Sequence, residues 1–210
     1  MKILGIGNAI VDVICKVDED FLSKNNLAKS TMKLVDESEF KKLLSNLKIE
    51  RTIAGGSVAN SIVGLAQLKN EVAFIGKVND DKLGKEYEKS LTKENVKYCY
   101  NKKSENVPTG TCLILITPDS ERTMCTYLGI SNDLTEIDLS VEAIQSAKYL
   151  FIEGYLLSSP SSLEACKTAI LAAKKKGVKV AISLSAEFIA SNFKAELESL
   201  FELGCDLLVC

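Results

Sequence analysis

The last third of the chain alternates between short apolar runs and longer helical patterns. Two parallel strands need a long crossover, which is usually a helix, so this order strongly restricts the fold. It predicts an α/β protein with a parallel sheet that has helices on both faces. The predicted strands and helices are, in order, Tyr149–Glu153, Pro160–Lys176, Lys179–Leu184, Glu187–Leu203 and Asp206–Cys210.

In the middle of the chain, three strand-like runs follow one another without helices between them. Pro118 and Asp119 predict a tight turn between the last two runs, because both residue types favour turn geometry. We expect these runs to form a small antiparallel sheet beside the main domain. The three runs are Val96–Tyr100, Thr111–Thr117 and Arg122–Leu128.

The first half of the chain supplies further strands and helices. Apolar runs predict the strands, and amphipathic periodicity predicts the helices. Asp80 stands where it can cap the helix that follows it. The predicted strands are Lys2–Ile10, Val11–Cys15, Ser30–Asp36 and Glu71–Val78, and the predicted helices are Asp18–Asn26, Glu37–Leu47 and Lys82–Lys93.

The final run, DLLVC, begins another apolar strand as the sequence ends. A domain seldom leaves its last core strand uncovered, because an exposed strand edge pairs readily with other chains. We therefore expect residues 1–210 to be the N-terminal part of a longer α/β protein.

The stretch Ala54–Asn60, AGGSVAN, combines two adjacent glycines with a predicted helix start. Glycine lets the backbone approach a ligand closely or adopt a positive φ. Ser57 and Asn60 can cap the helix, or they can direct their polar atoms at a bound molecule. Such a helix start suits a hydroxyl-rich or anionic small molecule. A Gly-Gly turn with a capped helix and no ligand is the alternative interpretation.

Composition excludes several classes of function. A net charge of −2 and a pI of about 5.5 argue against binding to nucleic acids or anionic membranes. The sequence contains no histidine, so catalytic triads and metal sites that use histidine are excluded. Seven scattered cysteines without a C-x-x-C pair indicate reduced thiols and a cytoplasmic protein. The cysteines in apolar surroundings are Cys15, Cys99, Cys112, Cys125 and Cys166.

Two features near the N-terminus are open to more than one interpretation. Gly5-x-Gly7 resembles the start of a dinucleotide-binding motif, but Ile10 replaces the third glycine, so a Rossmann oxidoreductase is a minor alternative. Asp12 lies between Val11 and Val13 on an alternating strand and faces the opposite side from them. Its carboxylate either faces solvent or accepts hydrogen bonds from the hydroxyls of a ligand.

Six motifs occur in one order along the chain: GNAIVD, DEDFLSKNNL, AGGSVANS, IGKVNDDKLG, PTGTCLILITPDSERTM and LSAEFI. In this order they resemble the ribokinase-like (PfkB) family of carbohydrate and nucleoside kinases, nearest its adenosine-kinase-like branch. The resemblance covers essentially the whole chain. It implies one αβα sandwich domain over residues 1–210, with a small β-sheet lid formed by strands near 12–17, 30–36 and 96–128. It also implies phosphorylation of a sugar or nucleoside hydroxyl with ATP and Mg²⁺.

The resemblance also implies roles for individual residues. Arg122 would approach the transferring phosphate, where positive charge is needed. Met32 and Cys112 lie on matching lid strands and could cover the ligand. The base-stacking aromatic of the family falls at Tyr155 or Leu156, and Leu156 there would favour a plain sugar. The residues expected to bind the substrate are Asn8, Asp12, Leu34, Gly55, Gly56, Ser57, Asn60 and Tyr155.

The chain departs from the family pattern in its catalytic motifs. The family's Asn-x-x-Glu motif and its Gly-Ala-Gly-Asp anion hole would both follow Cys210. We therefore expect the general-base Asp beyond Cys210, no catalytic residue or metal ligand within the chain, and negligible turnover by residues 1–210 alone. A non-catalytic sugar- or nucleoside-binding module is the alternative function. The expected partner is a small molecule, and two copies of the chain could pair through the lid.

Overall fold

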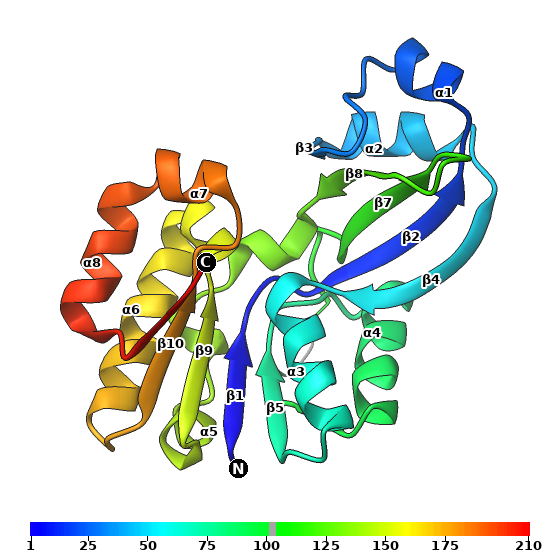
Figure 1. The fold of residues 1–210 in the computed structure, drawn as a ribbon. Coiled ribbons are helices and arrows are strands. Elements are labelled where there is room, and N and C mark those ends of the chain that lie inside the picture. Colours follow the sequence, from blue (N-terminus) through cyan, green and yellow to red (C-terminus); the bar gives the residue numbers. More distant parts are fainter. Residues whose placement is uncertain (101–103) are drawn as a thin grey trace.

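The computed structural model describes residues 1–100 and 104–210, and its centre is a six-stranded parallel sheet (Figure 1). The strand order is β11-β10-β9-β1-β5-β6, so β1 lies between the two halves of the sheet. The strands are β1 (Ile3–Ile6), β5 (Val72–Ile75), β6 (Val96–Tyr98), β9 (Tyr149–Glu153), β10 (Lys179–Ser183) and β11 (Leu207–Val209).

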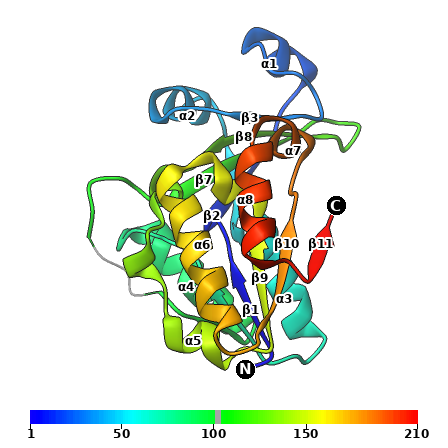
Figure 2. The ribbon, with the colours of Figure 1, turned by 90° about the vertical axis from the view of Figure 1, so that its left-hand side faces the viewer.

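Helices cover both faces of this sheet, as the alternating pattern predicts. Ile62 of α3 and Leu91 of α4 pack on one face with Phe74 of β5. The other face contacts α5, α6 and α8, and Figure 2 shows β1 and β9 between α6 and α3. The helices are α3 (Ser57–Gln67), α4 (Lys82–Lys93), α5 (Val141–Ser146), α6 (Pro160–Lys174), α7 (Glu187–Asn192) and α8 (Lys194–Gly204).

A second, five-stranded sheet lies beyond the carboxyl ends of β1 and β5 (Figure 1). Its order is β3-β8-β7-β2-β4, and it mixes parallel pairs with antiparallel ones. One face packs against two short helices through Leu22 and Phe40. The elements are β2 (Ile10–Lys16), β3 (Met32–Leu34), β4 (Ile49–Gly55), β7 (Gly110–Ile116), β8 (Arg122–Tyr127), α1 (Glu19–Lys24) and α2 (Glu37–Leu44).

The two sheets are joined where their strands meet end to end. β1 continues into β2 through Gly7, Asn8 and Ala9, and β4 continues into α3 through Gly56. These junctions lie at the carboxyl edge of the parallel sheet, where α/β proteins commonly bind ligands. In the described part of the chain, 3-10 helices complete the connections at Gly129–Asp133, Glu136–Asp138 and Gly154–Ser158.

Two predictions about the small sheet are wrong. It is not purely antiparallel, because β2 pairs in parallel with β7 and β3 pairs in parallel with β8. The run beginning at Val96 belongs to the main sheet, where β6 pairs in parallel with β5. Residues 101–103 of the expected lid region lie outside the described part of the chain. The sheet also contains β4, which the sequence patterns missed because most of its side chains are exposed and show no apolar alternation.

Two helix boundaries also differ from the prediction. The helix expected over residues 187–203 is divided into α7 and α8 at Phe193, whose φ of −120° and ψ of 34° are not helical. Asp81, not Asp80, caps α4, and its carboxylate accepts a hydrogen bond from the Gly84 amide at 2.8 Å. The first difference is a break within a predicted helix, and the second is a shift of one residue at a helix start.

None of the helices in the described ranges combines the length and the apolar character that crossing a membrane requires. β3 and β4 form the two edges of the small sheet. Pairing of two copies through this sheet stays a prediction.

Candidate functional site

A cavity of about 260 Å³ lies between the small sheet and the carboxyl edge of the parallel sheet. Its lining combines polar groups from the strand junctions and the start of α3 with apolar side chains from the small sheet. The lining residues are Asn8, Ile10, Asp12, Met32, Leu34, Gly56, Ser57, Asn60, Cys112, Ile114, Met124, Thr126, Leu128, Glu153 and Tyr155.

Gly56 turns the chain from β4 into α3 at the edge of the cavity. Its φ of 104° is a conformation that glycine adopts far more readily than other residues, and a Cβ here would collide with the Asn8 carbonyl oxygen. Gly56 occupies the N-cap position of α3, and glycine has no side chain that could cap the helix. Of the two roles left open for Ser57 and Asn60, neither side chain caps α3, and both residues line the cavity.

Glu153, at the end of β9, binds the amides of both strand junctions. Its Oε2 accepts a hydrogen bond from the Val58 amide at 2.9 Å, and its Oε1 accepts one from the Asn8 amide at 3.4 Å. The Val58 amide belongs to the first turn of α3, so a carboxylate 95 residues away satisfies that helix end. Gly7 leaves room for this carboxylate, because a Cβ at Gly7 would collide with it.

Glu153 is 1% exposed, and burial is the main influence on its protonation. Burial raises the pKa of the Glu153 carboxyl from 4.5 to about 7, although the hydrogen bonds from Val58 and Asn8 lower it. Glu153 therefore changes its charge close to neutral pH. The sequence analysis does not identify Glu153 as a site residue. The signal that could have identified it is an acidic residue at the end of an apolar run that is predicted to be a parallel strand.

Asp12 faces the cavity while its neighbours Val11 and Val13 face the apolar cores, as predicted from the strand alternation. Burial raises the pKa of the Asp12 carboxyl to about 6, and the charge of Arg122 offsets part of this shift. Beside it, the Oδ1 atom of Asn8 is buried without a hydrogen-bond partner in the described structure. A buried polar atom without a partner is costly, so a bound group that donates to it would stabilise the site.

The opposite wall of the cavity is apolar. Tyr155 also lines the cavity, and its ring packs against Phe188 with 5.9 Å between the ring centroids. Burial raises the pKa of the Cys112 thiol to about 12, so this thiol stays neutral in the cavity. The apolar wall consists of Ile10, Met32, Leu34, Ile114, Met124 and Leu128.

The structure brings together most of the predicted substrate-binding residues. Gly55 is not part of the cavity lining but lies directly behind it, since a Cβ on Gly55 would be 2.5 Å from Asp12 Oδ2. Arg122 lies at the exposed start of β8, outside the lining. Leu156 is 1% exposed in a core, so Tyr155 is the residue of that pair that reaches the cavity. The predicted residues in the lining are Asn8, Asp12, Leu34, Gly56, Ser57, Asn60 and Tyr155.

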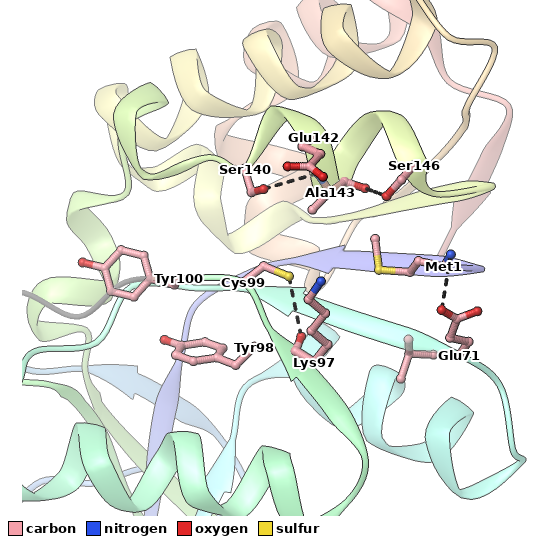
Figure 3. A pocket seen from close by; sticks show the side chains of 11 residues that line it. Met1, Glu71, Lys97, Tyr98, Cys99, Tyr100, Ser140, Glu142, Ala143 and Ser146 are labelled. Carbon is pink, nitrogen blue, oxygen red and sulfur yellow. Dashed lines mark hydrogen bonds and ion pairs between the residues drawn. The ribbon is translucent and has the colours of Figure 1, made fainter.

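A larger cavity of about 420 Å³ lies near the amino ends of β1 and β5. Figure 3 shows Ser140, Glu142 and Ser146 on one side of it and Met1 and Lys97 on the other. Its lining includes none of the predicted site residues and no strand junction. The smaller cavity is therefore the better candidate, because it combines a helix start, the buried Glu153 carboxyl, the half-buried Asp12 carboxyl and an unpartnered amide oxygen.

The chemistry of the smaller cavity suits a neutral ligand with several hydroxyls. Carboxylate and amide oxygens accept hydrogen bonds from hydroxyls, and exposed Ser57 and Asn60 can both donate and accept. Residues 1–100 and 104–210 contain no group of three or more Cys, Asp or Glu side chains placed to hold a metal ion.

The chain is similar to known carbohydrate and nucleoside kinases. Residues 3–210 match the family described as pfkB family carbohydrate kinase. Adenosine kinase 2 of Arabidopsis thaliana is 28% identical over 203 residues, which are 91% of this chain and 57% of that protein. The 5-dehydro-2-deoxygluconokinase of Mesomycoplasma hyopneumoniae is 31% identical over 145 residues, 67% of this chain and 42% of that protein.

The fold is also close to that of a solved structure. The crystal structure of adenosine kinase from Sinorhizobium meliloti superposes with a TM-score of 0.92 and 32% sequence identity. The match covers 99% of this chain and 64% of that chain. The chain thus spans less than two thirds of the length of these relatives.

Proposed function

Because the chain belongs to the pfkB family of carbohydrate kinases, we propose that its cavity binds the sugar or nucleoside that such a kinase phosphorylates with ATP. The predicted family and its ribokinase-like fold are confirmed by the match over residues 3–210 and by the TM-score of 0.92. The substrate, the cofactor and the roles of individual residues belong to the proposal.

The observation that carries the proposal is a buried polar atom without a partner beside a carboxyl group in the same cavity. Among the described residues the buried Oδ1 of Asn8 has no hydrogen-bond partner, and the Asp12 carboxyl lines the cavity with it. A ribose offers vicinal hydroxyls that donate to such acceptors. Hydrogen bonds to a charged acceptor are about twice as strong as neutral ones, so Asp12 is the main anchor in this proposal.

The apolar wall supports a nucleoside over a plain sugar. A sugar alone would leave Met32, Ile114 and Met124 facing polar hydroxyls, whereas a purine would cover them with a flat apolar surface. Tyr155 lines the same cavity, and its ring can stack on a base. Adenosine kinases among the similar proteins agree with this assignment.

In this proposal the described residues hold the acceptor substrate, and ATP with Mg²⁺ supplies the transferred phosphoryl group. Phosphoryl transfer depends mainly on positioning and on stabilising charge. Asp12 and Asn8 would hold the ribose, and the start of α3 would place Ser57 and Asn60 beside it. Arg122 would contribute positive charge only by reaching toward the cavity from the start of β8.

The proposal is tested by measuring the affinity of the protein for adenosine and ribose by NMR titration. We expect adenosine to bind more tightly than ribose, and Asp12→Asn to weaken adenosine binding about 10-fold or more, because a charge-assisted acceptor is lost. Asp80→Asn is the matched control, since Asp80 is an exposed aspartate that pairs with Lys85 outside the cavity. Equal affinities for the two variants would contradict the proposed site.

A further inference from the structure

Tyr87 is a buried polar residue that lies outside the cavity lining. It belongs to α4 and is 0% exposed, and its ring packs against Phe74 and Tyr98 with centroid distances of 6.4 and 6.0 Å. Its hydroxyl donates a hydrogen bond to the carbonyl oxygen of Gly55 at 3.2 Å. This bond joins α4 to the last residue of β4.

Gly55 occupies a sensitive position for the cavity. Its Cα lies against the Asp12 carboxyl group, and the next residue, Gly56, begins the turn into α3 with a φ of 104°. The carbonyl of Gly55 and the amide of Gly56 share one planar trans peptide group and point in opposite directions. The Gly56 amide therefore points away from Tyr87, and Gly56 lines the cavity.

A peptide group between two glycines is easily rotated, because neither residue has a Cβ to restrict its backbone angles. Ligand sites need their contacting groups held within about 0.5 Å. The Glu153 carboxylate fixes the Val58 amide on one side of this junction. Tyr87 fixes the Gly55 carbonyl on the other side, so both ends of the turn are held by side chains from distant elements.

We propose that Tyr87 is a positioning residue, which holds the Gly55–Gly56 peptide in the orientation that the ligand cavity requires. The proposal rests on the proposed function for its effect on ligand affinity. It does not require Tyr87 to touch the ligand. Burial raises the pKa of the Tyr87 hydroxyl well above its usual value, and Glu153 and Asp12 add to this shift, so the hydroxyl remains a donor at physiological pH.

Tyr87→Phe removes the hydroxyl and keeps the ring, and Tyr98→Phe is its matched control. Tyr98 lies beside Tyr87 and likewise donates to a glycine carbonyl, that of Gly76, which does not line the cavity. We expect both variants to lower the melting temperature to a similar degree. We expect only Tyr87→Phe to raise the Kd for adenosine, by about five- to tenfold, while Tyr98→Phe changes it less than twofold.

A second readout needs no ligand. Hydrogen exchange of the Val58 amide, measured by NMR, should be at least threefold faster in Tyr87→Phe and unchanged in Tyr98→Phe. Should Tyr87→Phe fail to fold, Tyr87→Met offers a second variant without the hydroxyl but with a large, adaptable apolar side chain.

The outcomes separate this inference from the proposed function. Unchanged Kd and unchanged Val58 exchange in Tyr87→Phe would overturn the positioning role, as would equal effects of the two variants. A wild-type protein that does not bind adenosine or ribose would overturn the proposed function. In that case the exchange of the Val58 amide alone decides whether Tyr87 holds the turn.

Discussion

Replacing Glu153 with Gln should remove a large part of the pH dependence of stability. Glu153 is 1% exposed, and it accepts hydrogen bonds from the Asn8 and Val58 amides. Burial raises the pKa of its carboxyl from 4.5 to about 7 in the folded protein. Gln is close to Glu in size and cannot ionise. It keeps only one of the two acceptor oxygens, and because that loss does not depend on pH, the pH dependence of the difference reports the charge.

The magnitude follows from this difference in pKa. Between pH 4.5 and 7 the unfolded chain has released the Glu153 proton while the folded chain still holds it, so a rise in pH favours unfolding. Each pKa unit corresponds to about 1.4 kcal/mol, which makes the loss about 3 kcal/mol across this range. Asp12, whose pKa is raised to about 6, adds a similar but lower-lying loss in both proteins.

The assay is denaturant unfolding of the wild type and Glu153→Gln at several pH values from 5 to 8 and constant ionic strength. The free energy of unfolding of the wild type should fall by about 3 kcal/mol relative to the variant over this range. Glu142→Gln, at an exposed position on α5, should leave the wild-type pH dependence unchanged. Parallel curves for the wild type and Glu153→Gln would refute the reasoning that burial controls this carboxyl.

Three further predictions concern the same cavity. Adenosine affinity should rise as the pH increases through about 6, because the Asp12 carboxyl is then ionised. An adenosine affinity that stays constant in NMR titrations from pH 5 to 8 would contradict this. Gly56→Ala should lower the free energy of unfolding by about 1–3 kcal/mol, which is more than the loss expected for Gly177→Ala. Both glycines have a positive φ, but only a Cβ at Gly56 would collide with the Asn8 carbonyl oxygen. Equal losses in denaturant unfolding would show that this collision is unimportant. Residues 1–210 should consume no ATP above background with adenosine or ribose in a coupled assay, and substrate-dependent turnover would place the catalytic base within this part of the chain.

Local sequence patterns correctly predicted many of the helices and strands. β9 was predicted to the residue, and α6 begins at Pro160 as expected because Pro is favoured at a helix start. β4 was missed because its exposed residues carry no burial pattern. The run from Val96 was assigned to the wrong sheet because a short strand carries no information about its partner.

The part of the candidate site that contains the two glycines was predictable from the sequence. The glycine pair predicted a close backbone approach, and the positive φ of Gly56 agrees with that expectation. Glu153 and Tyr87 were not predictable as parts of the site, because their hydrogen-bond partners lie 95 and 32 residues away in the sequence. Only the folded arrangement brings these side chains to the Gly-Gly turn.

The central claim, that the cavity at the Gly-Gly turn holds a nucleoside, is tested most directly by mapping adenosine binding on the isotope-labelled protein. The account predicts that the backbone amide signals of Asn8, Ser57 and Asn60 shift on titration, while those of Lys97 and Ser140 at the larger cavity do not. Shifts confined to Lys97 and Ser140, or no shifts at all, would contradict it.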